Sequence, residues 1–204
     1  MANHPMTAPA LALLEFHSIA AGIEAGDAMV KRAPVERIRA GTIQPGYYLV
    51  LVTGEVADVV EAVDAGIIAG GDALRDRLLL PNVHPGVVAA LSGARASGDD
   101  TTAADALGIV ETATVAAGIL AADAGLKGAE VQLNQLRLGD GLGGKGLALF
   151  VGLVSDVEAA VAIGGDLVAD QVVRRAVIAR LHGEMWDNVN TGGRFGDHFA
   201  WPAV

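Results

Sequence analysis

The feature that most constrains the fold of this chain is that its sequence repeats. A string near the N-terminus recurs 96 positions later (from 15 to 111), and a string in the middle of the chain recurs at a shift of 98 (from 54 to 152). Repeats at a fixed period indicate repeated structural units. The chain is therefore predicted to hold two copies of one fold, with two residues gained in the second copy between Lys127 and Gly152. The matching strings are Ala12 to Glu15 with Gly108 to Glu111, Asp27 to Lys31 with Asp123 to Lys127, and Gly54 to Val59 with Gly152 to Val157.

Both copies predict the same order of elements, read from apolar runs, helical spacing and turn residues. First-copy strands are predicted at Leu11 to Phe16, Glu36 to Thr42, Tyr47 to Thr53 and Arg77 to Leu80, with helices at Ile19 to Ala33, Val56 to Leu74 and His84 to Leu91. Second-copy strands are predicted at Ala106 to Thr112, Gln132 to Leu138, Gly146 to Val151 and Val173 to Ile178, with helices at Val115 to Ala129, Val154 to Val168 and His182 to Val189. The order β-α-β-β-α-β plus a closing helix predicts an α/β (α+β) protein with two tandem ferredoxin-like domains.

The repeat also predicts the domain boundaries. They are an N-terminal extension 1–10, a first domain 11–91, a linker 92–104, a second domain 105–189 and a C-terminal tail 190–204. The linker is rich in Ser, Gly, Asp, Thr and Ala, as flexible connections are. The tail carries Phe195, Phe199 and Trp201 and is predicted either as a disordered end or as a short docking segment.

Charge and cysteine content exclude several classes of function. The formal net charge is −10, which repels nucleic acid and anionic lipid, so we expect neither as a partner. The chain has no cysteine, which excludes disulfides and thiolate metal sites, and no cofactor is predicted. Mean hydropathy is +0.43, yet no run of about 20 apolar residues is free of charges or glycines. We therefore expect no membrane span, and the N-terminus lacks signal-peptide features, which favours the cytoplasm.

Particular strings resemble a known family. Ala106 to Thr112, followed by Asp123 and Lys127, is similar to the opening of a shell domain of bacterial microcompartments, and Leu13 to Glu15 with Gly26 to Lys31 is similar in the first copy. Two unpermuted domains in tandem resemble the BMC-T class of that family. The resemblance implies a non-enzymatic shell protein that forms a pseudohexameric homotrimer with a central pore for small metabolites. It also implies hexameric tiles and pentameric vertices as shell partners, and encapsulated enzymes as further candidates.

Within this class, the chain is similar to the cluster-bearing trimers of propanediol-utilisation compartments. The shared strings are Thr42 to Gly46, Asn82 to Pro85, Gly143 to Lys145 and Glu184 to Trp186. Gln44 stands where those trimers have the cysteine that holds an iron–sulfur cluster, and an amide supplies no thiolate, so no cluster is predicted. The resemblance implies that the pore is lined by Thr42, Ile43, Gln44, Pro45 and Gly46 together with Gly139, Asp140, Gly141, Leu142 and Gly143. Three Asp140 carboxylates at such a pore would favour cationic or neutral solutes.

The family resemblance also implies which residues form the tile edges. Lys31 and Lys127 occupy the position of a lysine that packs against its twin on the neighbouring tile. The family places an arginine just before the last histidine of each domain; the second copy has Arg180 there, whereas the first has Asn82. Without the family, solvated helix-end charges would explain the two lysines equally well.

Several short motifs have a second explanation. Gly139 to Lys145 matches the start of a P-loop, but an apolar strand follows in place of a helix and Gly146 replaces the Ser or Thr that holds magnesium, so a hairpin loop is favoured. His84 and His182 recur without an orienting acid, which favours a role at a helix start over catalysis. Glu15 and Glu111 resemble a paired acid site, but their equivalence in the repeat favours backbone contacts near a domain interface.

Two other functions remain as alternatives to the shell protein. One is a trimeric ferredoxin-like regulatory protein that binds a small metabolite between subunits, because ferredoxin-like units serve many functions. The other is an enzyme, for which the sequence offers no convergent acid–base set.

Overall fold

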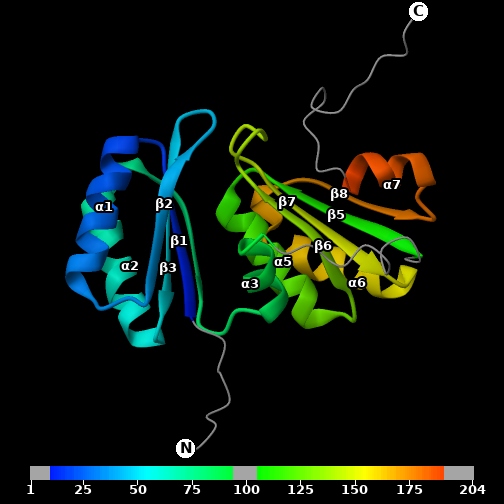
Figure 1. The fold of residues 1–204 in the computed structure, drawn as a ribbon, viewed down its shortest axis with the longest axis horizontal. Helices are drawn as coiled ribbons and strands as arrows, with labels where there is room; N and C mark the ends of the chain where they lie inside the picture. The colour runs from blue at the N-terminus through cyan, green and yellow to red at the C-terminus, as the bar shows by residue number, and fades with distance from the viewer. Residues whose placement is uncertain (1–9, 94–104, 191–204) are drawn as a thin grey trace, which may run out of the picture.

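The computed structural model describes residues 10–93 and 105–190, and the predicted linker and tail lie almost wholly outside those ranges. Each copy of the repeat folds into an antiparallel four-stranded sheet with two helices on one face (Figure 1). The first domain consists of β1 (Ala10–Phe16), α1 (Ile19–Arg32), β2 (Arg37–Ile43), β3 (Tyr47–Gly54), α2 (Val56–Gly70), the 3₁₀ turn η1 (Gly71–Ala73), β4 (Leu74–Leu80) and α3 (Pro85–Leu91). The second consists of β5 (Ala106–Thr112), α5 (Val115–Gly128), β6 (Gln132–Leu138), β7 (Gly146–Gly152), α6 (Val154–Leu167), the 3₁₀ turn η2 (Ala169–Gln171), β8 (Val172–Ala179) and α7 (Gly183–Asn190).

Strand order is the same in the two sheets, β2-β3-β1-β4 and β6-β7-β5-β8. All six neighbouring pairs are antiparallel, which is the arrangement of a ferredoxin-like unit. The predicted fold class of two tandem α/β units is confirmed. The loop between β2 and β3 has three residues, 44–46, whereas that between β6 and β7 has seven, 139–145, so the second copy is longer in the predicted region.

One predicted element differs clearly from the structure. The helix predicted to run from Val56 to Leu74 ends at Gly70, because Gly71 has a φ of +49° and begins a 3₁₀ turn. β4 consequently starts at Leu74, three residues before the predicted strand. The difference matters because Arg75 and Asp76 then lie on a strand of the sheet.

The core of the first domain is closed by the second domain. β1 is buried along its whole length, although a sheet with helices on one face alone would leave every second residue exposed. Ala12, Leu14 and Phe16 pack in one cluster with α1 and α2, whereas Leu11 and Leu13 belong to a second cluster that contains α5. The second domain therefore covers the open face of the first sheet, as the neighbouring position of α5 in Figure 1 illustrates.

Helix starts are fixed in the same way in both domains. The hydroxyl of Ser18 accepts a hydrogen bond from the N–H of Ala21 at the start of α1, and Thr114 does the same for Ala117 at the start of α5. In the described ranges, no helix has both the length and the apolar character needed to cross a lipid bilayer.

Candidate functional site: the domain interface and the paired hairpins

The two domains are joined by a buried ion pair. The carboxylate of Glu15, at the end of β1, is fully buried and accepts hydrogen bonds from the Arg75 guanidinium of β4 and from the backbone N–H of Val115, the latter at 3.0 Å. Val115 is the first residue of α5, so a carboxylate of one domain caps a helix of the other. The predicted backbone contact near a domain interface is thus confirmed for Glu15.

Arg75 and Asp76 extend this contact across the interface. The Nη2 of Arg75 donates to the carbonyl oxygen of Ala113 in the second domain at 2.7 Å, and its guanidinium lies 4.4 Å from the ring centre of Tyr47. The hydroxyl of Thr114 donates to the carboxylate of Asp76 while it caps α5. Sequence reasoning missed both Arg75 and Asp76 because they fell between a predicted helix and a predicted strand.

Burial governs the protonation of Glu15. Removal of the carboxyl from water raises its pKa, and the charge and hydrogen bond of Arg75 and the N–H groups of Val115 and Ala116 offset that rise only in part. The ion pair therefore compensates a carboxylate that the fold has already placed in an apolar setting.

A second contact across the interface involves two of the residues predicted to lie at a tile edge. The Nζ of Lys127, in the last turn of α5, donates to the carbonyl oxygen of Asn82 in the first domain and pairs with Asp123 at 2.6 Å. Asp123 in turn accepts a hydrogen bond of 2.7 Å from the backbone N–H of His84. Lys127 and Asn82, whose contact was not predicted, thus meet at one junction between domains.

The repeat-equivalent residues lie at opposite ends of the chain. Lys31 and Asp27 on α1 correspond to Lys127 and Asp123, and in this single chain they pair with each other at 2.5 Å, both exposed to solvent. Arg180, which follows β8, corresponds to Asn82 and is also exposed; its φ is +51° and its N–H donates to the carbonyl oxygen of Asp105. The edge role predicted for these residues stays a prediction.

The two predicted pore loops lie side by side at one end of the molecule (Figure 1). Gly139 packs so closely on the first loop that a Cβ there would come within 2.5 Å of the Cδ1 of Ile43, and a Cβ on Gly144 would lie 2.8 Å from the Tyr47 ring. The tips are accessible, since Thr42, Gln44, Pro45 and Gly46 of one loop and Asp140, Gly141 and Gly143 of the other are exposed.

The glycine-rich segment from Gly139 to Lys145 is a hairpin loop, as predicted. It links two paired strands, and its positive φ values at Gly139, Gly141, Gly143 and Gly144 suit a tight turn. Lys145 pairs with Glu111 at 2.7 Å. The backbone contact predicted for Glu111 is therefore replaced, in the single chain, by a side-chain ion pair within its own domain.

The histidines act at helix starts and in packing. His84 precedes α3, and its Nδ1 accepts a hydrogen bond from the N–H of Gly86 at 3.1 Å, which confirms the predicted role. The carbonyl of His182 accepts from the N–H groups of Met185 and Trp186 at the start of α7. The ring of His17 packs edge-on against Tyr47. Within residues 10–93 and 105–190, no three His, Asp or Glu side chains gather in a way that would hold a metal ion.

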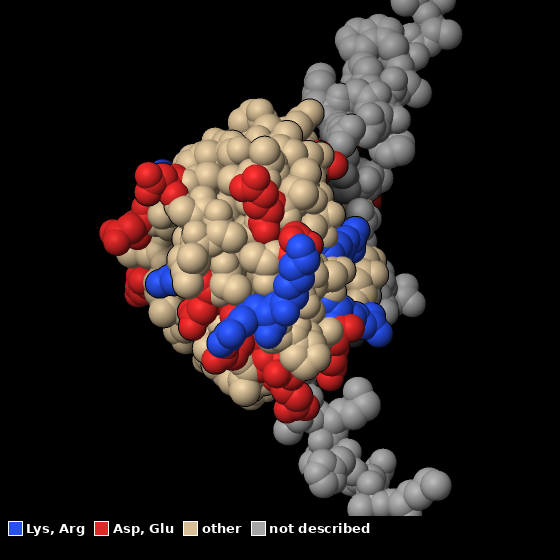
Figure 2. Space-filling view, turned by 90° about the vertical axis from the view of Figure 1, so that its left-hand side faces the viewer, with Lys and Arg blue, Asp and Glu red and all other residues tan. Residues whose placement is uncertain are grey.

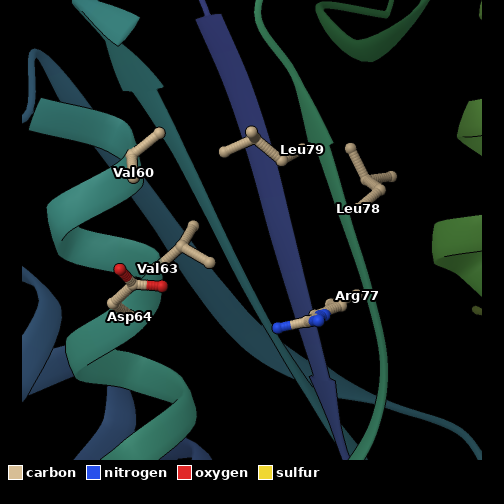
Figure 3. Close-up of a pocket in the computed structure, with 6 residues that line it drawn as sticks. All are labelled: Val60, Val63, Asp64, Arg77, Leu78 and Leu79. Atoms are coloured by element: carbon tan, nitrogen blue, oxygen red, sulfur yellow. The ribbon is translucent and has the colours of Figure 1, made fainter. Parts of the chain in front are cut away.

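A pocket of about 300 Å³ lies between α2 and β4 of the first domain. Figure 3 shows its lining, in which Asp64 on the helix and Arg77 on the strand are the only charged groups among aliphatic side chains. At the position equivalent to Asp64, the second domain has Ala162. Asp64 is the one side chain of this lining that could act as an acid or a base.

Comparison with known proteins agrees with this architecture. Residues 10–83 and 106–181 each match the family model described as BMC domain. The chain belongs to the BMC domain family. It is 40% identical over 185 residues to the bacterial microcompartment shell protein PduT of Citrobacter freundii, a match that covers 90% of this chain and 98% of that protein.

Other relatives show the same family. The chain is 30% identical over 191 residues to the carboxysome assembly protein CcmO of Synechocystis sp., with 85% of this chain and 63% of that protein covered. A crystal structure of a microcompartment protein from Desulfitobacterium hafniense DCB matches with a TM-score of 0.76 at 39% identity, over 88% of this chain and 99% of that one. A fused permuted hexameric shell protein of the RMM microcompartment shares the fold alone, with a TM-score of 0.54 at 19% identity over 79% of this chain and 84% of that one. The predicted resemblance to tandem shell domains is confirmed.

Proposed function

We propose that this protein is a structural tile of a bacterial microcompartment shell, in which three copies close into a pseudohexagonal ring around a pore. The family match and the similarity to PduT support the shell role. The observation that carries the ring is the interface inside the chain. The half that contains Asp123 and Lys127 recurs as Asp27 and Lys31 on the outer side of the first domain. The half that contains Asn82 and His84 recurs as Arg180 and His182 on the outer side of the second domain.

The repeat supplies the contacts expected between copies. Asp123 and Lys127 bind the backbone of His84 and Asn82 across the domain interface. By the same geometry, Asp27 and Lys31 of one copy would bind the backbone N–H of His182 and the carbonyl of Arg180 in the next. Such a contact joins two different surfaces head to tail, and it closes into a ring when the rotation fits.

The hairpin loops support the predicted pore. A three-fold ring of two-domain chains would bring the paired tips around one axis, with Gln44 from the first loop and Asp140 from the second. Both are exposed on the single chain, as a pore lining requires. Amides accept and donate hydrogen bonds, whereas a ring of carboxylates favours cations, so polar neutral and cationic metabolites would pass in preference to anions.

The tile-edge proposal keeps the four residues predicted from the family. Lys127 and Asn82 meet at the junction of the two domains, and in the proposed ring Lys31 and Arg180 would meet at the equivalent junction between copies. Because Asn82 alternates with Arg180, the ring would present two kinds of edge. The pocket of Figure 3 lies within one domain, whereas the regulatory alternative needs a site between subunits.

Sedimentation of the purified protein tests the ring. We expect a particle of three times the 20.7 kDa chain mass, and loss of that particle in Asp27→Ala with Lys31→Ala. The matched control is Arg32→Ala with Glu61→Ala, which removes an exposed ion pair between α1 and α2 that has no counterpart in the domain interface. A trimer that survives the first double substitution would refute the proposed contact.

Electron microscopy of sheets tests the edge assignment. The wild-type protein, alone or mixed with hexameric shell proteins, should form extended hexagonal layers. Lys31→Asp combined with Lys127→Asp should abolish these layers, either by repulsion between carboxylates where tiles meet or by loss of the ring contact of Lys31. Sedimentation of the same variant distinguishes the two causes, since only the first leaves the trimer intact. Layers that persist would contradict the edge role of these lysines.

A further inference from the structure

The outer surface of α1 carries an apolar stripe that its counterpart in the second domain buries. On α5, Val115 and Ile119 are completely buried and Leu126 nearly so, in the cluster that covers the first sheet. The equivalent residues on α1, Ile19, Ile23 and Val30, are 40%, 54% and 41% exposed. Exposed aliphatic side chains at helical spacing indicate a surface that binds another protein. The side of the molecule that bears α1 and α2 shows wide uncharged areas between mixed acidic and basic groups (Figure 2).

The surface that would receive this stripe is the open face of the second sheet. In the first sheet, Leu11 and Leu13 of β1 lie on the open face and belong to the cluster that contains α5. Their equivalents in the second sheet are Leu107 and Ile109 of β5. A second copy that repeats the inner interface would therefore place its α1 on the latter pair.

In the single chain that face is already occupied by α7. Trp186 is buried there with Leu107, Leu149 and Val151, and Val189 packs on the same cluster. Two hydrogen bonds tie the end of α7 to β6, from the Gln135 amide to the carbonyl of Val189 at 2.7 Å and from the Asn134 amide to Asn190 at 3.2 Å. Figure 1 shows α7 on the side of this sheet opposite to α5 and α6.

The equivalent helix of the first domain behaves differently. α3 crosses to the second domain and packs against β6 and α5, with Gly86 near the side chain of Leu126. α7, in contrast, packs on the sheet of its own domain. The same element of the repeat thus has two positions, one across an interface and one on the sheet face where the interface would form.

We propose that α7 is a displaceable cover of the assembly surface, which shields Leu107 and Ile109 in the free chain and gives way to α1 of a second copy. On assembly α7 moves onto β2 and α1 of that copy, as α3 lies on β6 and α5. This inference rests on the proposed ring. It assigns to α7 a function in the free protein, which is to protect an apolar sheet face that would otherwise bind non-specifically.

A crosslink between α7 and β6 tests the displacement. The chain has no native cysteine, so Asn134→Cys with Asn190→Cys introduces the only two thiols. We expect a short bismaleimide to join them within one chain in dilute monomer and the joined protein to lose the trimer. The single substitutions, treated with the same reagent, are the matched controls and should still form trimers.

The outcomes separate this inference from the proposed ring. A wild-type protein that never associates would refute the ring itself. A trimer that forms equally well from joined and unjoined protein would overturn the displacement of α7 and leave the ring intact. Failure of the two thiols to join in monomer would overturn the position of α7 on its own sheet.

Substitutions on α1 test the other half of the contact. Ile23→Glu places a charge in the exposed stripe and should leave the protein folded but monomeric. Ile68→Glu on α2 is the control, because Ile68 is 82% exposed and lies outside the stripe. Equal association of the two variants would show that the α1 stripe is not the surface that displaces α7.

Discussion

Replacement of Arg75 by methionine should weaken the chain in a way that depends on pH. Arg75→Met keeps the length and apolar stem of the side chain but leaves the buried Glu15 carboxylate without its cation. Removal of one partner of a buried pair is strongly destabilising because the other charge stays in an apolar setting. Only protonation of Glu15 removes this buried charge.

The size of the effect follows from the free energy needed to protonate Glu15. With an ordinary pKa of 4.5, protonation of the carboxyl at pH 7 costs about 3.4 kcal/mol, at about 1.36 kcal/mol per pH unit, and at pH 5 about 0.7 kcal/mol. Loss of the hydrogen bond to the carbonyl of Ala113 adds about 1 kcal/mol at either pH. We therefore expect a loss of unfolding free energy of up to about 4 kcal/mol at pH 7 and of about 2 kcal/mol at pH 5.

The sign of the pH dependence of stability follows from the direction of the pKa shift. The pKa of Glu15 is raised in the folded protein, so the folded state binds more protons than the unfolded state above pH 4.5. The contribution of Glu15 to the unfolding free energy therefore falls as pH rises above 4.5. The fall continues to a higher pH in the variant, where the pKa of Glu15 rises further.

Urea denaturation of dilute protein between pH 5 and pH 8 measures the difference. Arg32→Met is the matched control, because Arg32 forms an exposed pair with Glu61 and should cost at most about 1 kcal/mol with no comparable pH dependence. A loss for Arg75→Met that is the same at pH 5 and pH 8 would refute the argument that Glu15 bears the cost.

Two of the three further predictions use the repeat as an internal control. Gly164→Ala should lower the unfolding free energy by about 1–3 kcal/mol, because its Cβ would lie 2.5 Å from the Ala121 carbonyl oxygen. At the equivalent Gly66 a Cβ would meet the flexible side chains of Leu14 and Met29, so Gly66→Ala should cost less. Equal losses of the two variants in thermal denaturation would contradict this. Asp123→Ala should lower the unfolding free energy by about 1–3 kcal/mol in the same assay, because it removes the acceptor of the His84 N–H. The equivalent change Asp27→Ala should leave the stability of the dilute chain unchanged and weaken its association. Asp140→Asn should reduce the preference of the pore for cations over anions in planar-bilayer conductance, and an unchanged selectivity would remove Asp140 from the pore lining.

Much of the fold was predictable because the repeat carries the same local signals twice. The strands and helices were placed by apolar spacing and by turn residues such as Gln44 to Gly46, and the second domain agrees with the prediction to within a residue or two at most ends. The boundary after α2 was not predictable from spacing, since Ile67 to Leu74 continues the apolar pattern. The chain leaves the helix there because Gly71 adopts a positive φ.

The contacts between domains were the part that sequence could not supply. Glu15 was expected near an interface, but its partner Arg75 is 60 positions away and is brought to it by the pairing of β1 with β4. Lys127 and Asn82 were both predicted for an edge, yet only the packing of α5 on the first sheet makes one bind the other. The repeat likewise did not predict that α3 packs on the other domain whereas α7 packs on the sheet of its own domain.

The differences between the copies fit the different demands on the two interfaces. The inner interface joins domains of one chain, which cannot diffuse apart, and it carries the buried pair of Glu15 with Arg75. In the proposed ring the outer interface would form between separate molecules, and the residues equivalent to Glu15 and Arg75 are Glu111 and Val173. Glu111 already pairs with Lys145 in its own domain, so association need not bury an uncompensated carboxylate. If the ring forms as proposed, the permanent interface thus contains a buried ion pair between domains, whereas the carboxylate at the reversible one has its cation within a single domain.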